Sequence, residues 1–401
     1  MPEVAEVAHV CALLRRNILG FRISRANLQN DPLLFPALKA SSDPNAELAK
    51  LSNSLTNSVI DSVGRHGKYF WLRLKLANNT EGTTGVFLMH FGMTGMIKIK
   101  NVKSHLIFME NGGDKKVLAK LKEEATESKY FKKEEVIIEK EEINEDEDVE
   151  WPPRFTKMEL QLEYQDRKLD FAFVDARRLG RVRLLIGDEY QTDESLLNQP
   201  PLNALGPDYS KPVKLDKNYK FTFGDPDPDN HGRPILSIED FNQLILKKKA
   251  PIKSLLLDQA YFAGVGNWVG DEICYRARIH PTEIISNKVS NLNNNIDPVV
   301  KKLYESLIYV CQESVRVEGE VSQFPKDWLM IYRWGKSRKK GPKPTTYEGY
   351  ALDHVTVGGR TSCFVPALQK PLKKRTIGEE TGGESGEAAP KKRAKKGVKI
   401  E

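Results

Sequence analysis

The chain has 401 residues, of which 39% are hydrophobic and 29% are charged, and its formal net charge is +7. A chain of this length has room for two or three domains, but it has no apolar run long enough to cross a membrane and no signal-peptide segment at its N-terminus. The four cysteines are far apart and include no Cys-x-x-Cys pair. This pattern predicts reduced, intracellular thiols and argues against a structural zinc site, so we expect neither a metal nor a cofactor.

An acidic stretch masks part of the basic character of the chain. Between Lys122 and Glu150 there are 13 acidic and 5 basic residues, a local charge of −8, which leaves +15 on the remainder. A strongly basic protein suits a polyanionic partner, because lysines and arginines that neutralise phosphates release bound counterions. A surface charged for solubility alone would have the same composition, so charge does not decide between the two.

The first residues, Met1-Pro2-Glu3, are suited to chemistry at the chain terminus. A small second residue permits removal of the initiator methionine, which would leave Pro2 with a free secondary amine. Such an amine condenses with an aldehyde carbon as lysines do in Schiff bases, and an α-amino group is less protonated near neutral pH than a lysine. Glu3 would be placed to move protons beside it. Taken alone, the two residues could equally well begin a helix.

The N-terminal half is predicted to be a β-sandwich with a helix packed against it. Residues 3–19 predict the helix, because apolar side chains recur at intervals of three and four residues and Gly20 follows. Residues 111–157 are charged, repetitive and poor in large apolar side chains, so we expect an inserted, largely disordered loop. The predicted strands cover 58–65, 68–76, 86–91, 96–100, 159–164, 168–174 and 181–186.

Helices replace strands after Leu205-Gly206-Pro207. A further pair of short strands is expected near the C-terminus, joined at Gly358-Gly359. From about residue 371 the chain is poor in apolar residues, so we expect a disordered basic tail with clusters at 373–375 and 391–396. These clusters fit a nuclear-import signal, although a solvated charge run is a serious alternative. The predicted helices cover 237–248, 252–257, 268–277 and 297–316, and the two strands cover 350–356 and 361–365.

Five short segments form an ordered set of motifs. They are Pro2-Glu3 with Glu6, then 64–69 (GRHGKY), 90–95 (HFGMTG), 175–180 (DARRLG), and 264–268 (GVGNW) continued by Asp271-Glu272 and 279–281 (IHP). Together they resemble the formamidopyrimidine-DNA glycosylase and endonuclease VIII superfamily over most of residues 2–369, and its formamidopyrimidine branch more closely. The resemblance implies a multidomain α+β fold, with an N-terminal β-sandwich and flanking helices before a helical helix–two-turn–helix domain.

The resemblance implies a catalytic set of Pro2, Glu3 and Lys68. The Pro2 nitrogen would attack deoxyribose C1′, and Glu3 would protonate the opening sugar. Lys68, in the hairpin at 64–69, would meet phosphate and sugar oxygens as a cation, although most lysines in turns are simply exposed. Glu6 lies one helical turn from Glu3, where a supporting role and a structural hydrogen bond are both reasonable.

The resemblance also implies that Met93, Arg177 and Leu179 fill the hole left by an extruded nucleotide. Methionine is flexible and apolar, whereas an arginine can hydrogen-bond the orphaned opposite base. Position 179 is commonly phenylalanine in bacterial relatives. Leu179 can still wedge but stacks less well than a phenylalanine ring, so we expect lesion search and opposite-base preference to differ from those of the bacterial enzymes.

Three further DNA contacts are implied by the resemblance: Asn267, Lys253 and Arg360. Asn267 precedes a predicted helix whose free amides would bind a phosphate, and Lys253 would make a second phosphate contact unless it is an ordinary solvated lysine. Many relatives have a zinc finger of four cysteines near the C-terminus, whereas residues 330–370 contain only Cys363. The hairpin there resembles the zincless finger of fungal and plant members, with Arg360 at its tip entering the minor groove.

We therefore expect a bifunctional DNA glycosylase and abasic-site lyase that acts on oxidised purines in double-stranded damaged DNA. Formamidopyrimidines are the favoured class, and 8-oxoguanine is left open. A non-catalytic binder of damaged DNA is the alternative, and a structured-RNA binder is a third possibility. We expect a monomer in the nucleus that engages an import factor through its tail. The expected divisions are a catalytic sandwich at 2–200, a helix–two-turn–helix domain at 201–325, the finger at 326–370 and the tail at 371–401.

Overall fold

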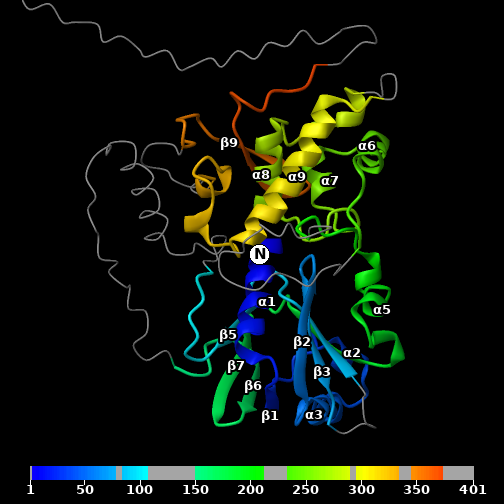
Figure 1. Cartoon of the computed structure of the whole chain (residues 1–401), viewed down its shortest axis with the longest axis vertical. Coiled ribbons are helices and arrows are strands. Elements are labelled where there is room, and N and C mark those ends of the chain that lie inside the picture. The colour runs from blue at the N-terminus through cyan, green and yellow to red at the C-terminus, as the bar shows by residue number, and fades with distance from the viewer. Residues whose placement is uncertain are drawn as a thin grey trace, which may run out of the picture.

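The computed structural model describes residues 2–77, 84–106, 150–211, 233–289, 295–333 and 345–373. Most of the predicted acidic insertion and nearly all of the basic tail lie outside these ranges. Among the described helices, none is long and apolar enough to span a bilayer. The described chain contains both β-rich and helical parts, and Figure 1 shows the N-terminal helix α1 (Val4–Ile18) running from one into the other.

Eight antiparallel strands form the N-terminal domain, in the order β5-β7-β6-β1-β2-β3-β4-β8. The register between β1 and β2 is a single pair, Arg22 opposite Val59, so the sheet bends there into two four-stranded halves. Their inner faces enclose one hydrophobic core, which confirms the expected sandwich. The strands are β1 (Arg22–Leu28), β2 (Val59–His66), β3 (Tyr69–Lys75), β4 (Thr84–His90), β5 (Met96–Ile99), β6 (Thr156–Tyr164), β7 (Arg167–Val174) and β8 (Arg181–Ile186).

Three helices and one strand in this domain are absent from the sequence-based expectation: β1, α2 (Pro36–Ala40), α3 (Pro44–Leu55) and α5 (Asp193–Leu197), which packs against β3 and β4. The helix α3 begins at Pro44, and the side chain of Asp43 accepts hydrogen bonds from the next two free amides at 3.0 Å each. An acidic cap followed by proline is a recognised start signal. Because only Leu55 of α3 is fully buried, its apolar periodicity is too weak to reveal the helix.

The C-terminal part is helical and encloses a second core rich in aromatic side chains. It ends in a two-stranded hairpin, β9 (Asp353–Val357) and β10 (Arg360–Phe364), as predicted. The turn needs its two glycines, because Gly358 and Gly359 both adopt left-handed conformations, with φ of 56° and 72°. The helices are α6 (Ile238–Lys247), α7 (Ile252–Leu256), α8 (Asn267–Ala277) and α9 (Pro298–Arg316).

Helix α1 belongs to both cores. Val4, Ala5 and Ala8 pack in the helical core, whereas Val7 and Val10 pack in the sandwich core. The N-terminal end of the chain therefore lies where the two parts meet, as Figure 1 shows. Glu318, just after α9, also joins the two parts, because its carboxylate pairs with Arg16 and His9 of α1.

Candidate active site

The N-terminus of the chain packs against a segment that is far away in the sequence, residues 264–269. Pro2 and Glu3 are both buried. The Glu3 carboxylate accepts hydrogen bonds from the backbone amides of Trp268 at 3.0 Å and Val269 at 3.1 Å, at the start of α8. The amide of Val4 donates to the carbonyl of Gly264 at 3.1 Å. The proline nitrogen and the Glu3 carboxylate are thereby fixed against the 264–269 segment.

The glycines of this segment are required by close packing. A Cβ atom at Gly266 would lie 2.1 Å from Cδ of Glu3, and one at Gly264 would lie 2.9 Å from Cβ of Val4. Gly67, in the turn between β2 and β3, would meet the Gly264 nitrogen at 2.8 Å. Side chains at these positions would push the N-terminus and the turn away from the loop, so the motif glycines bring the three segments together.

The start of α8 corrects one expectation from the sequence. The amides of Trp268 and Val269, expected to be free for a phosphate, are occupied by the Glu3 carboxylate because the helix end favours a negative charge. Asn267 is the first helical residue rather than the cap. Its side-chain nitrogen donates to the carbonyl of Thr361 in β10 at 3.1 Å. Asn267 thus connects α8 to the finger hairpin.

Glu6 supports the same arrangement. One of its carboxylate oxygens accepts the Glu3 amide at 2.9 Å, and the other accepts the indole N–H of Trp268 at 3.1 Å. Burial, reinforced by the neighbouring Glu3 carboxylate, raises the pKa of Glu6 to about 7. A carboxyl group with a pKa near neutral therefore lies one helical turn from Pro2, beside the Glu3 carboxylate, which suits proton transfer at the proline nitrogen.

The turn that carries Lys68 is held by a buried ion pair. The Asp208 carboxylate accepts the Gly67 amide at 2.9 Å and pairs with the Arg65 guanidinium at 2.7 Å. Burial would raise the pKa of Asp208, but Arg65 and Lys211 outweigh it and the pKa is lowered. Asp208 therefore fixes the backbone next to Lys68 as a permanent anion.

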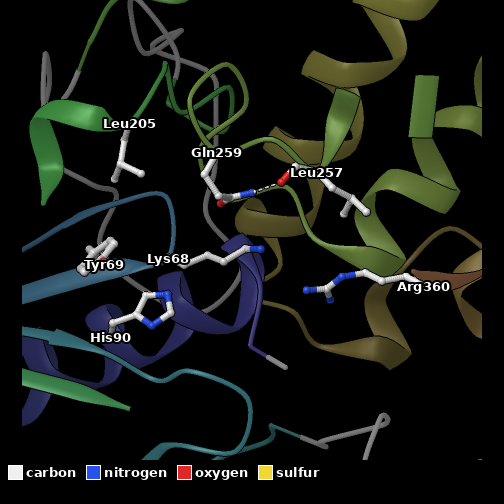
Figure 2. A pocket seen from close by; sticks show the side chains of 7 residues that line it. All are labelled: Lys68, Tyr69, His90, Leu205, Leu257, Gln259 and Arg360. Carbon is white, nitrogen blue, oxygen red and sulfur yellow. Dashed lines mark hydrogen bonds between the residues drawn. The ribbon is translucent and has the colours of Figure 1, made fainter. Parts of the chain in front are cut away.

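The Lys68 side chain lines a pocket with a volume of about 210 Å³. Figure 2 shows its ammonium group and the Arg360 guanidinium pointing toward each other from opposite sides. Burial, assisted by Lys68, lowers the pKa of His90 to about 4, so this imidazole is neutral at physiological pH. Its Nδ1 accepts the Gly92 amide at 3.0 Å. A pocket with a cation on each side is suited to phosphate oxygens. Its lining residues are Lys68, Tyr69, His90, Leu205, Leu257, Gln259 and Arg360.

The prediction from sequence did not include His90 or Gln259. Gln259 donates to the carbonyls of Leu257 and Val265, at 2.9 and 2.8 Å, and accepts the Gly264 amide at 3.1 Å. It therefore shapes the loop that receives the N-terminus. His90 opens a motif that was already recognised, so its position was a usable signal, whereas the hydrogen bonds of Gln259 depend on loop conformation and leave no pattern in the sequence.

Lys253 differs from its expected place. Its side chain is fully buried and pairs with Asp271 of α8, and its ammonium group also donates to the Asn267 carbonyl. The expected solvated lysine or exposed phosphate contact is thus replaced by an internal ion pair, because α7 packs directly against α8. Lys253 fixes the backbone of Asn267 rather than presenting a charge at the surface.

The three predicted void-filling residues lie on two loops that are joined to each other. The Thr94 hydroxyl, next to Met93, donates to the Asp175 carboxylate at 2.6 Å. The Arg177 amide hydrogen-bonds both of these groups at 3.2 Å. Leu179 is 39% exposed, and the Arg177 side chain is exposed as well. The structure therefore brings these loops together and leaves the arginine and leucine facing solvent.

Phe155 is an exposed aromatic residue at the base of these loops that sequence reasoning missed. Its ring is 48% exposed, its φ is +66°, and the Arg154 guanidinium lies 4.6 Å above the ring centroid. Its carbonyl accepts the Asp175 amide at 3.0 Å. A bulky residue at positive φ is rare and costs conformational energy. Phe155 falls within the disordered insertion expected at 111–157, and for that reason it was not predicted to be part of the site.

A cluster of His9, His105 and Glu318 has ligand atoms within 4.8 Å of one another. The Arg16 guanidinium donates to both Glu318 oxygens at 2.8 Å, and His9 Nδ1 lies 3.0 Å from one of them. A bound cation would have to displace Arg16. These contacts are suited to fastening α1 to the chain after α9 rather than to holding a metal.

Comparison with known proteins gives a consistent result. Models of the formamidopyrimidine-DNA glycosylase N-terminal domain and H2TH domain match residues 1–182 and 226–326. A formamidopyrimidine-DNA glycosylase of Arabidopsis thaliana is 28% identical over 399 residues, covering 100% of this chain and 76% of that protein. One of Listeria innocua is 30% identical over 141 residues, covering 34% of this chain and 49% of that protein.

Two solved structures have the same fold. One is MutM in complex with DNA containing carbocyclic 8-oxo-G, and the other is Lactococcus lactis Fpg in complex with DNA containing an abasic site. Each has a TM-score of 0.55 and 17% sequence identity and covers 92% of this chain. The matches cover 100% and 99% of those two chains. The architecture described above is therefore shared with DNA-bound proteins.

Proposed function

Because this chain belongs to the formamidopyrimidine-DNA glycosylase family of base-excision-repair enzymes, we propose that it removes oxidised purines and then cleaves the strand at the abasic site. Formamidopyrimidines are the favoured substrates, with 8-oxoguanine as a second. The observation that carries the proposal is the fixed position of Pro2 and Glu3 against Gly264 and the start of α8, beside the turn that carries Lys68.

The proposed reaction begins at the proline nitrogen. Once Met1 is removed, the lone pair of Pro2 forms a bond to C1′ as the bond from C1′ to the damaged base breaks, and the departing base takes a proton from water. The Glu3 carboxylate takes the N–H proton from the Pro2 nitrogen and passes it to the ring oxygen, which opens the sugar and yields an iminium ion. This ion makes the 2′ proton acidic, so its loss expels the 3′ phosphate, and a second elimination expels the 5′ phosphate. Lys68 and Arg360 stabilise the phosphates on either side of the pocket.

Extrusion of the nucleotide completes the proposal. The loops that carry Met93, Arg177 and Leu179 would enter the stack, with Arg177 bonding the orphaned base. Phe155 lies at the base of the same loops and offers a further ring for stacking. The net positive charge of the chain favours approach to DNA.

Borohydride trapping on a duplex with one abasic site tests the chemistry. Wild type is expected to form a covalent complex, whereas Pro2→Gly and a variant extended at its N-terminus are expected to lose most of it. Mass spectrometry should show a chain that lacks Met1. The exposed, distant Lys75→Ala is the matched control and should trap like wild type. Salt-sensitive DNA binding by a methionine-free chain that does not trap would reject the lyase and favour a non-catalytic binder.

The cellular setting is a separate proposal. We propose that the enzyme acts as a monomer in the nucleus, imported through the basic residues at 373–375 and 391–396, most of which lie outside the described residues. A fluorescent fusion in which both clusters are replaced by alanine should lose nuclear accumulation. Unchanged accumulation of that variant would reject the clusters as the import signal.

A further inference from the structure

One buried carboxylate holds the finger hairpin against the helical domain. Asp271 lies on α8, and its Oδ2 atom accepts the Cys363 amide of β10 at 3.1 Å. The same oxygen accepts Nε and Nη2 of Arg333, at 3.2 and 2.8 Å, while Oδ1 pairs with Lys253. The side chains of Asp271 and Lys253 are 0% exposed and that of Arg333 is 6% exposed. The carboxylate thus links α7, α8, the chain before the hairpin and the hairpin itself.

The cluster reaches two residues assigned to DNA. The Lys253 ammonium that pairs with Asp271 also donates to the Asn267 carbonyl. The Asn267 side chain in turn donates to Thr361, the neighbour of Arg360. Asp271 is therefore connected through one intermediate residue to the backbone of Asn267, and through the β10 backbone to Arg360.

The hairpin needs such support because a two-stranded hairpin of five residues per strand is marginal in water. The thiol of its single cysteine is buried, and burial raises the pKa of Cys363 to about 12. Cys363 instead contributes its backbone amide to Asp271. Besides the apolar packing of Cys363 and Val365 in the helical core, the hairpin is therefore held by a hydrogen bond to a charged carboxylate that lies outside it.

We propose that Asp271 is a positioning residue that sets the finger: its contacts with Lys253, Arg333 and the Cys363 amide hold the hairpin where Arg360 meets DNA. In this chain one carboxylate and two buried cations take the part that four cysteines and zinc play in relatives with a zinc finger. The role in DNA binding rests on the proposed function, whereas the role in holding the hairpin does not.

The first test uses Asp271→Asn, which keeps the shape and one acceptor oxygen but removes the charge. Amide hydrogen exchange in residues 353–364 should become about tenfold faster or more, because two buried cations lose their counterion. Exchange in the sandwich strands should not change. The control is Asp297→Asn, a buried cap at the start of α9 away from the hairpin. Unchanged hairpin exchange in Asp271→Asn would overturn the proposal.

The second test asks whether Asp271 acts through Arg360. Asp271→Asn should raise the Kd for abasic-analogue DNA about tenfold, while trapping at saturating DNA changes little. In an Arg360→Ala background the same substitution should add almost nothing, because the contact it positions is already gone. Fully additive effects would overturn a role through Arg360 and leave general destabilisation.

If Asp271→Asn does not fold, Arg333→Gln tests the same idea. This variant removes one of the two cations but keeps the ion pair between Asp271 and Lys253. Its hairpin should also exchange faster, by a smaller factor, and unchanged exchange would count against the proposal. The proposed lyase activity and the proposed role of Asp271 in holding the hairpin can be rejected independently. A wild-type chain that fails to trap rejects the lyase, yet faster hairpin exchange in the Asp271 variant would still support the hairpin role.

Discussion

At the scale of single residues, the carboxyl pair of Glu3 and Glu6 gives the site its pH dependence. Glu3 accepts two amides at a helix start, whereas Glu6 is partly buried beside it and has its pKa raised to about 7. A carboxyl protonated in the folded chain but ionised in the unfolded chain makes stability depend on pH in a known direction.

Glu6→Gln tests that dependence, because glutamine resembles the protonated acid. The folded pKa of about 7 lies above the ordinary 4.5, so the stabilisation is complete below pH 4.5 and is lost as the pH rises through 7. Relative to the variant, wild type should lose roughly 3 kcal/mol of unfolding free energy across that window. Urea unfolding at several pH values measures it. Parallel profiles for both proteins would show that folding does not raise the pKa of Glu6.

Gly266→Ala should disable the site without straining the backbone. The φ of Gly266 is −125°, which any residue adopts, so the effect comes from the added Cβ at 2.1 Å from Glu3. We expect a loss of about 1–3 kcal/mol in unfolding free energy and loss of trapping. Gly349→Ala is the contrast: its φ is +87° with no neighbour within 4 Å, so it should cost about 1 kcal/mol and still trap. Normal trapping by Gly266→Ala would contradict the assigned position of Glu3.

Sequence reasoning identified motifs better than it identified partners. Pro2, Glu3 and Lys68 could be predicted as site residues because a family motif marks each position, and the glycines near them proved to be steric requirements. The hydrogen bond of Asn267 to Thr361 and the ion pair of Lys253 with Asp271 could not be predicted from the sequence. The residues of each pair are separated in the chain, and only the packing of α7, α8 and β10 brings them together. Phe155 was missed because a charged insertion surrounds it.

At the scale of elements, the finger hairpin is the part with least support of its own. Gly359→Ala should therefore have a measurable local effect, since φ is +72° and nothing lies within 4 Å of the added Cβ. The backbone strain should cost about 1 kcal/mol and weaken DNA binding severalfold, because Arg360 follows directly. Gly359→Asn should retain binding, since asparagine tolerates this conformation. Fluorescence anisotropy with labelled DNA measures both, and equal affinities would contradict a fixed hairpin tip.

Elements were predictable where burial is periodic. Helix α1, the paired strands and α9 each carry a regular apolar pattern, and their bounds agree with the expectation within a few residues. Helix α3 lacks such a pattern because it lies on the surface with a single buried leucine. Strand β1 has mixed polar and apolar positions and gains its place from pairing with β6.

At the scale of the whole molecule, the two parts are joined by α1 and by Glu318. Glu318→Gln should weaken this junction, because the carboxylate that serves Arg16 and His9 is nearly buried. We expect a loss of about 2–3 kcal/mol and a calorimetric transition that splits in two as the sandwich and helical parts unfold separately. Glu163→Gln, an exposed ion pair within the sandwich, should leave one transition. A single, unshifted transition for Glu318→Gln would contradict the junction.

The burial of Pro2 also sets an order of events during synthesis. The proline leaves the ribosome first, but the residues that enclose it, Gly264 through Val269, are made more than 250 residues later. The proposed removal of Met1 would therefore have to precede closure of the helical part over Pro2. A chain that escapes processing would fold around a blocked terminus, so the rate of translation, and not only the fold, would decide what fraction of the molecules becomes active.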